Sequence, residues 1–358
     1  MSTSELFQHK KVAILLTVFN GEKYIEETLK SILSQEYKNI SIIVVDDGSQ
    51  DGSSRILEKY IKTNNDLIRI VRHRQNLGAT AALKTGFKNL KAEEEFVLTI
   101  AQDDLLPSNY ITSGIQKFHA KDTSVLFSNL WIIDKIGRPD RRITAAANSG
   151  LLGKYQLAAV FSRNLINAPG AMIRTEHLES SFLDANYPYT HDMHLWMNLA
   201  TKGKIRLFFG SFCFYRVHSS SITSNRNNSK LHEEISRSRF DFLNSKAFEE
   251  FIYKLNKKQK YIFFILIKLM TNNESNCKHK IAWSTKLRLL LEIHGKRISA
   301  EDNCQTYQPV RKLEILHEPW KNPKFTVIAN YLFTSISTIK LIIKVFVSCV
   351  YRPSRERN

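Results

Sequence analysis

Two pairs of adjacent aspartates, Asp46-Asp47 and Asp103-Asp104, are the residues best suited to do chemistry. Each pair follows a run of apolar residues, so both are expected at strand ends. Taken singly, such a pair more often caps a helix or forms a turn. Two pairs at the rim of one sheet repel each other and lose hydration unless a cation or hydrogen-bond donors join them. Magnesium and manganese prefer carboxylate oxygen and commonly bind diphosphate. The pairs therefore predict a site where one holds metal and the other addresses the base or sugar of a nucleotide.

Apolar runs and helical spacing place these pairs on a sheet of alternating strands and helices. Residues 12–16 form a continuous apolar run, which is typical of a strand buried on both faces of a parallel sheet. The alternation predicts an open, mainly parallel α/β sheet with helices on both faces. Ligands bind such sheets at the carboxyl ends of the strands. The predicted strands here are residues 12–16, 40–45, 68–71 and 96–100, and the predicted helices are 21–35, 51–61 and 79–90.

After Pro107 the predicted strands and helices no longer alternate regularly, and helical patterns dominate from Ser229 onward. A length of 358 residues suits one large α/β domain with an appendage. We therefore predict a nucleotide-sugar domain over residues 1–225 and a basic, mainly helical region over 226–358. The later expectations are strands at 125–133 and 205–215, a turn at 137–139, a loop at 148–153, and helices at 192–202, 231–255 and 259–270.

The segment after the first strand argues against two other classes of nucleotide enzyme. It reads Thr-Val-Phe-Asn-Gly at residues 17–21. A dinucleotide-binding domain carries Gly-x-Gly-x-x-Gly there, so that a helix amino end approaches pyrophosphate. An enzyme that transfers a nucleotidyl group to a sugar phosphate would carry a Gly-rich, basic loop at the same point. Neither pattern is found, so hydride transfer and nucleotidyl transfer lose their main support.

Six segments between Lys11 and Thr223 together resemble the inverting family 2 glycosyltransferases, which have the GT-A fold. They are Thr-Val-Phe-Asn-Gly at 17–21, Ser-Ile-Leu-Ser-Gln at 31–35, Val-Val-Asp-Asp-Gly-Ser at 44–49, Asn-Leu-Gly-Ala at 76–79, Gln-Asp-Asp at 102–104 and Tyr-Arg-Val-His at 215–218. The resemblance implies a Rossmann-like sheet and transfer of a sugar from a nucleoside diphosphate to a bacterial surface glycan such as lipopolysaccharide or capsule. A UDP-sugar is the simplest donor. The Gln-Asp-Asp form also resembles members that use dTDP-rhamnose.

The same resemblance assigns donor-side roles to residues of these segments. The nucleoside contacts fall on Thr17, Phe19 and Asp47. The Asp-x-Asp-type metal motif has Ala101 at its first acidic position, so Asp103 becomes the ligand of Mn²⁺ or Mg²⁺. His218 follows a strand and precedes a serine-rich turn, and it is expected to bind the metal or a phosphate. The remaining expected nucleotide-sugar contacts are Asn20, Arg74, Asn76, Gly78, Gln102, Asp104 and Arg216.

The resemblance also implies a catalytic aspartate at the start of a helix behind the acceptor site. Asp192 matches that position, with His191 where the family usually has Glu. Such a carboxylate takes the proton of the acceptor hydroxyl as the oxygen attacks the anomeric carbon. The alternative is that Asp192 only caps its helix. His191 and His194 lie three residues apart without a third metal ligand at suitable spacing, so acceptor-site or packing roles are expected for them.

Charge distribution separates the end of the chain from the rest. Of the 52 Lys and Arg and 34 Asp and Glu, residues 1–224 hold 27 and 22, and residues 225–358 hold 25 and 12. Such a surface suits an anionic partner. Lysines bracket the apolar residues 261–267, and further basic residues flank those at 325–351, which permits shallow insertion at a membrane carrying a lipid-linked acceptor. The alternative is packing on the catalytic domain or on a second subunit, which would give a homo-oligomer.

Location and nucleic-acid binding are judged from composition. The four cysteines are widely spaced and form no Cys-x-x-Cys pair, so neither a zinc cage nor a secreted disulfide framework is indicated. The first eleven residues lack the apolar stretch of a secretory signal. We expect a cytoplasmic protein, peripheral on the inner face of the membrane. A basic nucleic-acid-binding protein is the non-enzymatic alternative, but the excess charge lies in Lys-rich helices beside apolar runs and not on an aromatic platform.

Overall fold

The first hundred described residues alternate strand and helix, as the sequence predicts. The computed structural model describes residues 9–118, 121–143, 156–162, 164, 166, 168–183, 187–219, 229–256, 259–260, 263–264 and 267. The elements of this first part are β1 (Lys11–Val18), α2 (Ile25–Leu33), β2 (Ile40–Asp46), α3 (Ser53–Thr63), β3 (Ile68–Arg72), α4 (Ala79–Lys88) and β4 (Glu94–Ala101).

The later part mixes short strands with helices. Its elements are α5 (Tyr110–Ile115), β5 (Thr123–Ile133), β6 (Pro139–Ile143), α6 (Gln156–Ser162), β7 (Met172–Arg174), the 3₁₀ turns η1 (Thr175–His177) and η2 (Ser180–Leu183), α7 (His191–Lys202), β8 (Lys204–Arg216), α8 (Ser229–Leu243) and α9 (Lys246–Lys254). The sequence reading missed α5, α6, β6 and β7, which are too short to show a clear period. The predicted loop at 148–153 lies outside the described residues.

The described strands form one mixed sheet of eight, in the order β3-β2-β1-β4-β7-β5-β6, with β8 paired to β5. The pairs β1–β2, β1–β4, β2–β3 and β5–β8 are parallel. The short β7 lies antiparallel between β4 and β5 and joins the two parallel groups. The predicted α/β sheet is therefore confirmed, with antiparallel strands in its second half.

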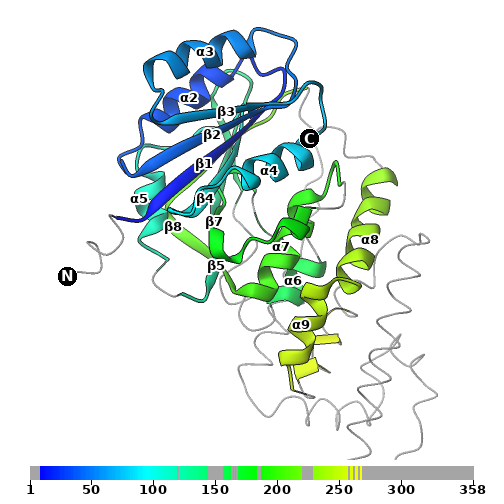
Figure 1. Cartoon of the computed structure of the whole chain (residues 1–358). Helices are drawn as coiled ribbons and strands as arrows, with labels where there is room; N and C mark the ends of the chain where they lie inside the picture. The colour runs from blue at the N-terminus through cyan, green and yellow to red at the C-terminus, as the bar shows by residue number, and fades with distance from the viewer. Residues whose placement is uncertain are drawn as a thin grey trace, which may run out of the picture.

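Residues of β1 alternate between two hydrophobic layers, which explains why the whole strand is apolar. Leu16 faces a layer with Ile25 and Leu29 of α2. Leu15 faces the opposite layer, which includes Ala82 of α4 and the buried side of α7. Figure 1 shows α2 and α3 above the sheet and α4 on the other side, next to the helices α6 to α9. Helices thus cover both faces of the sheet.

The helix predicted over 231–255 is interrupted, because α8 ends at Leu243 and Ser245 caps the start of α9. The Ser245 hydroxyl accepts a hydrogen bond from the Phe248 N–H at 3.2 Å, a typical N-cap. Beyond α9, Phe263 and Ile267 are buried in the same hydrophobic layer as α7. The described residues of 261–267 therefore pack on the domain, which is the alternative to membrane insertion, and the others lie outside the described part of the chain. Residues 325–351 lie outside the described part. None of the described helices combines the length and apolarity needed to cross a bilayer.

Candidate functional site

Both acidic pairs lie at the carboxyl edge of the sheet, on the strands that flank β1. Pairing with β2 sets Val18 beside Asp46. Pairing with β4 sets Thr17, half-buried in β1, beside Ala101. The Asp47 N–H donates to the carbonyl of Val18 at 2.7 Å. Because neighbouring strands lie about 4.8 Å apart, the two acidic pairs emerge about two strand spacings from each other.

Asp46 holds the turn between β2 and α3. Its Oδ1 accepts from the Ser49 N–H at 3.0 Å, and its Oδ2 accepts from the Ser54 hydroxyl at 2.7 Å. Gly48 between them has φ +77°, and a Cβ there would lie 2.6 Å from the backbone of Gln75. Only glycine combines that backbone conformation with so close an approach. The turn is therefore pressed against the loop that follows β3.

Asp47 is buried and organises that neighbouring loop. Its Oδ1 lies 2.6 Å from His73 Nδ1 and accepts from the Leu77 N–H at 2.9 Å, and its Oδ2 accepts from the Gly78 N–H at 2.8 Å. His73 is in turn held by the Thr85 hydroxyl at 2.9 Å. Oδ2 has one bond from the described residues and retains capacity for another donor. The sequence reading missed His73, which stands alone in its loop without a motif to mark it.

Hydrogen bonds join the loop after β1 to the turn after β2. Asn20 has φ +51°, its N–H donates to the Ser49 hydroxyl at 3.0 Å, and its side-chain oxygen accepts from the Gln50 N–H at 2.8 Å. Asn20 thus has a backbone-organising role, since Asn tolerates the left-handed region better than other non-glycine residues. The neighbouring Phe19 ring remains 37% exposed at the edge.

Gln102 joins the end of β4 to the end of β1. Its Oε1 accepts from the Phe19 N–H at 2.6 Å, and its Nε2 donates to the Phe19 carbonyl at 2.9 Å. A Cβ at Gly21 would lie 2.4 Å from Gln102 Oε1, so glycine leaves room for this pairing. Both polar ends of the Gln102 side chain contact backbone. The structure thus shows Gln102 positioning Phe19, and its predicted contact with the nucleotide stays a prediction.

Asp103 and His218 meet at the rim of the sheet. Asp103 Oδ2 lies 3.0 Å from His218 Nε2, and the side chains are 18% and 17% exposed. The His218 ring also stacks on Tyr24, with centroids 5.1 Å apart. These two residues, 115 apart in sequence, are brought together because β8 ends beside the segment after β4. The sequence reading missed Tyr24 as part of the site.

Asp104 and Arg216 were expected to contact the nucleotide, and the structure corrects both. Each residue is 1% exposed. Asp104 Oδ1 accepts from the Arg216 N–H at 3.1 Å, while Oδ2 has no hydrogen-bond partner among the described residues. Burial, together with the charge of Asp103, raises the pKa of the Asp104 carboxyl well above its usual range. Asp104 therefore lies behind the rim and out of contact with a ligand at the edge.

The guanidinium of Arg216 contacts four other residues around the site. It donates to the carbonyl of Asp103 at 2.9 Å, to the carbonyl of Asp134 at 3.2 Å and to the carboxylate of Glu27 at 2.6 Å. It also lies over the Tyr24 ring, 4.8 Å from the centroid. A buried cation with this many protein partners positions its neighbours, so Arg216 supports His218 and Asp103 from behind.

The pair of Asp103 and His218 is compatible with a divalent cation. Ligands at about 2.1 Å on adjacent corners of an octahedron lie about 3.0 Å apart, which equals the separation of Asp103 Oδ2 and His218 Nε2. Within the described part of the chain, no three His, Cys, Asp or Glu side chains form a metal-binding group. Magnesium and its relatives usually take only one or two protein ligands when they bind a nucleotide diphosphate. Asp103 and His218 match that number of protein ligands.

Arg74 and Asn76 lie exposed in the loop after β3. The Asn76 side-chain oxygen accepts from the Gly78 N–H at 2.8 Å, and Gly78 has φ +93° directly before α4. Asn76 thus shapes the turn that delivers the Gly78 N–H to Asp47. The Arg74 side chain adds a positive charge at this edge of the sheet.

Asp192 lies in the first turn of α7, but Thr190 and not Asp192 is the N-cap residue. Asp192 Oδ2 accepts from the Asn164 amide at 2.7 Å, and its Oδ1 accepts from the Met193 N–H at 2.7 Å. The side chain is half-buried. Asp192 thus satisfies a backbone donor of the first turn from one position inside the helix, and it also binds Asn164, a partner that the sequence reading did not identify.

The start of α7 approaches the loop that Asp47 organises. The Thr80 hydroxyl, in the first turn of α4, donates to the carbonyl of Tyr187 at 3.1 Å. Thr80 follows Gly78 by two residues, and Tyr187 precedes Asp192 by five. One short path of contacts thus leads from Asp47 to the segment that carries Asp192.

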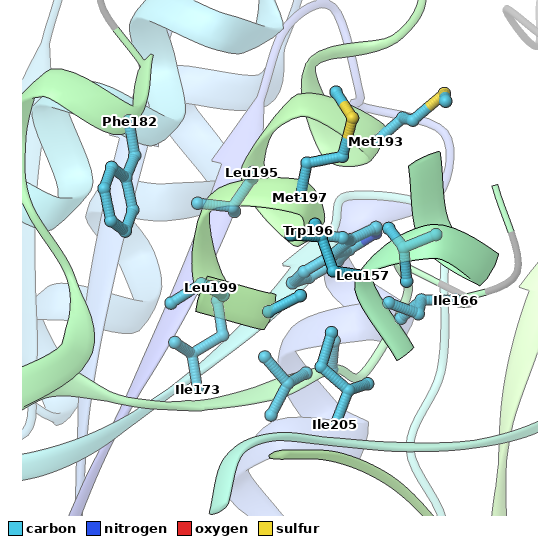
Figure 2. Close-up of a cluster of buried hydrophobic side chains, with 14 of the residues drawn as sticks. Leu157, Ile166, Ile173, Phe182, Met193, Leu195, Trp196, Met197, Leu199 and Ile205 are labelled. Carbon is cyan, nitrogen blue, oxygen red and sulfur yellow. The ribbon is translucent and has the colours of Figure 1, made fainter. Parts of the chain in front are cut away.

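Helix α7 is anchored by apolar side chains around most of its circumference. Figure 2 shows Met193, Leu195, Trp196, Met197 and Leu199 among side chains from α6, β7, η2 and β8. All of these α7 residues are at most 2% exposed. Truncating such a core side chain costs about 2–5 kcal/mol. This packing therefore holds the helix backbone at Asp192 in place.

His194 has a packing role. It is 7% exposed, its ring lies 4.7 Å from that of Tyr187, and its Nδ1 lies 3.0 Å from the Ser238 hydroxyl. Burial lowers the pKa of His194 to about 4. Its neighbour His191 has a buried Nδ1 without a hydrogen-bond partner among the described residues.

Comparison with known families gives a match over about half of the chain. Residues 13–182 match the description "Glycosyl transferase family 2". This range covers the strands β1 to β4 and ends before α7.

Curated relatives of this chain are described as glycosyltransferases. An uncharacterized glycosyltransferase of Rickettsia bellii is 29% identical over 252 residues, which is 67% of this chain and 34% of the relative. An uncharacterized glycosyltransferase of Haemophilus influenzae is 23% identical over 328 residues, covering 85% of this chain and 98% of the relative. The chain thus spans about a third of the Rickettsia protein and nearly all of the Haemophilus one. Among solved structures, S. aureus TarS 1-349 in complex with UDP-GlcNAc aligns with a TM-score of 0.48 at 16% identity, covering 83% of this chain and 93% of that one.

Proposed function

Since residues 13–182 belong to glycosyl transferase family 2, we propose that this chain moves a sugar from a nucleoside diphosphate to a hydroxyl of a growing bacterial surface glycan, with inversion at the anomeric carbon. The observation that carries the proposal is the meeting of Asp103 and His218 at 3.0 Å, on the same sheet edge as Asp47. That edge is where ligands bind open α/β sheets.

The donor edge, comprising residues 17–22, 46–53, 73–78, 102–104 and 216–218, would bind the nucleotide. The remaining acceptor capacity of Asp47 Oδ2 suits an N–H of the base. The exposed Phe19 ring offers an apolar surface beside it, and Thr17 and Arg74 lie at the same edge. A UDP-sugar is the simplest donor, and a dTDP-sugar presents the same base N–H, so the choice between them falls to the experiment.

Asp103 and His218 would hold Mn²⁺ or Mg²⁺ on the diphosphate. When bound, such an ion neutralises the negative charge that the departing diphosphate gathers. Arg216 and Tyr24 keep the two ligands in place from behind. Asp104 lies buried behind this rim.

Asp192 would act as the base on the acceptor. Its carboxylate takes the hydroxyl proton while the acceptor oxygen forms a bond to the anomeric carbon and the bond from that carbon to the diphosphate oxygen breaks. The Asn164 amide holds one carboxylate oxygen in a defined orientation. A single displacement of this kind inverts the configuration.

A lipid-linked acceptor at the inner membrane face remains part of the proposal. Its support is the excess of 25 basic over 12 acidic residues in 225–358. Co-sedimentation of the full chain with anionic vesicles, compared with a chain ending at Pro323, tests this point. Equal sedimentation of the two proteins would contradict anchoring by the last residues.

The donor is tested by thermal shift with a panel of nucleotide sugars in the presence and absence of Mn²⁺. A correct donor raises Tm because it binds only the native state. The shift should depend on Mn²⁺ and should be lost in Asp103→Asn but kept in Asp66→Asn, an exposed aspartate after α3. Tight, salt-dependent binding of oligonucleotides without any nucleotide-sugar response would instead support the nucleic-acid alternative.

A further inference from the structure

One face of α8 contacts the segment that carries Asp192. Glu234, Ser238 and Asp241 recur at i, i+4 and i+7, the spacing of a single helix face. Ser238 lies 3.0 Å from His194 Nδ1, and Asp241 accepts from the Tyr187 hydroxyl at 2.5 Å. Figure 1 shows α8 running alongside α7. The face is polar, and Glu234 and Ser238 are buried, so its role is specific contact and not general packing.

Glu234 accepts several hydrogen bonds at the start of α7. It is 6% exposed, and its Oε1 accepts from the Tyr189 N–H at 2.8 Å, the Thr190 N–H at 2.7 Å and the Thr190 hydroxyl at 2.9 Å. Thr190 is the N-cap residue of α7 and makes no side-chain cap bond of its own. The carboxylate of another helix therefore satisfies backbone donors at this helix end, where the dipole favours a negative charge.

Arg239 of α8 holds the end of α6, shortly before Asn164. The side chain is 1% exposed and donates to the carbonyl of Phe161 at 2.7 Å and to that of Ser162 at 2.6 Å. Those carbonyls end α6, where a cation is favourable. Asn164, which donates to Asp192, follows two residues later. Helix α8 thus holds both segments that meet at the Asp192 carboxylate.

We propose that Glu234 is a positioning residue for Asp192, and that α8, which lies beyond the matched residues 13–182, completes the acceptor side of the site. The inference rests on the proposed function, because it assumes that Asp192 is the base. A general base works only within hydrogen-bond reach of its proton. A displacement of about 1 Å in such a group costs about a hundredfold in rate.

The test compares Glu234→Ala with Glu234→Gln. Gln keeps an oxygen that accepts the same three bonds, whereas Ala removes it. We expect Glu234→Ala to lower kcat by about 10- to 100-fold while KM for the donor and the Kd for UDP with Mn²⁺ change less than twofold. Glu234→Gln should restore kcat to within about threefold of wild type. Hydrogen exchange at the Tyr189 and Thr190 amides should accelerate at least about tenfold in Glu234→Ala alone.

Controls separate the inference from the function on which it rests. Glu249→Ala, at an exposed glutamate of α9, should leave kcat, KM, the Kd for UDP and the amide exchange rates unchanged. If Glu234→Ala does not fold, Glu234→Asp, whose shorter carboxylate falls short of the backbone donors, should show the same loss of kcat. Wild-type kcat in these variants beside an active wild type would overturn the inference only. Failure of the wild type to bind any nucleotide or transfer any sugar would overturn the proposed function and, with it, the inference.

Discussion

At the donor edge, loops from neighbouring strands hold one another through short hydrogen bonds, whereas around Asp192 the same task falls to buried side chains of the helix α8. Asp47, Asn20 and Gln102 each bind backbone of an adjacent loop. On the acceptor side, Glu234 and Arg239 reach across from α8. The donor edge therefore depends on strand register, which the sheet supplies, and the acceptor side depends on how helices pack. Substitutions should accordingly affect ligand binding in the first region, and turnover or stability in the second.

The largest effect is expected at Asp192, which separates turnover from binding. Asp192→Asn removes the base but keeps a side chain of the same size beside Asn164. We expect kcat to fall by about 10²- to 10⁴-fold, the usual contribution of a general base, with the Kd for UDP unchanged within twofold. Steady-state kinetics and calorimetric titration measure the two quantities. Retained turnover would reject Asp192 as the base.

Asp103→Asn is expected to weaken nucleotide binding, whereas Asp192→Asn lowers turnover. Losing one of the two ligand side chains is expected to raise the Kd for UDP by about 10- to 100-fold in the presence of Mn²⁺, with little change in its absence. Titration with and without the metal measures this difference. Equal losses in both conditions would mean that Asp103 contributes to the fold and not to a metal site. Asp66→Asn serves as the matched control.

His194 makes the stability of the acceptor side depend on pH. Its pKa is about 4 in the folded chain because of burial, against about 6.5 in the unfolded chain. The unfolded chain therefore binds the proton first, and stability is complete above pH 6.5 and falls as the pH drops toward 4. Between pH 7.5 and pH 5 the loss from this group is about 2 kcal/mol.

Urea unfolding at both pH values measures that loss, and His194→Gln should reduce it by the same amount. His232→Gln, at an exposed histidine of α8, should keep the wild-type dependence. An unchanged pH dependence in His194→Gln would show that other groups cause it.

The smallest effect is expected from His73→Ala at the donor edge. Asp47 would lose one of three protein partners and keep the Leu77 and Gly78 N–H groups. Because one hydrogen bond contributes about 0.5–1.5 kcal/mol net, the Kd for UDP should rise by about 3- to 10-fold with kcat little changed. Calorimetric titration measures the change, with His232→Ala as control. An unaltered Kd would show that the backbone alone positions Asp47.

Much of the donor edge could be predicted from the sequence, because apolar runs end where ligands bind. The runs before Asp46 and Ala101 marked both strand ends within about two residues of their positions in the structure. The order of strands then follows from the parallel alternation. The roles of side chains such as Arg216 and Gln102 were not predictable in this way, because a polar residue at a strand end looks the same whether it faces a ligand or the neighbouring loop.

The sequence by itself determined the alternating sheet, the two acidic pairs at its edge and the family match, all of which depend on local pattern. Only the tertiary structure decided that His218 meets Asp103, that Asp104 is buried, and that Glu234 binds the start of α7. These contacts join residues 44 to 115 positions apart. No local periodicity encodes such a pairing, because it arises when packed strands and helices bring distant segments within hydrogen-bond distance.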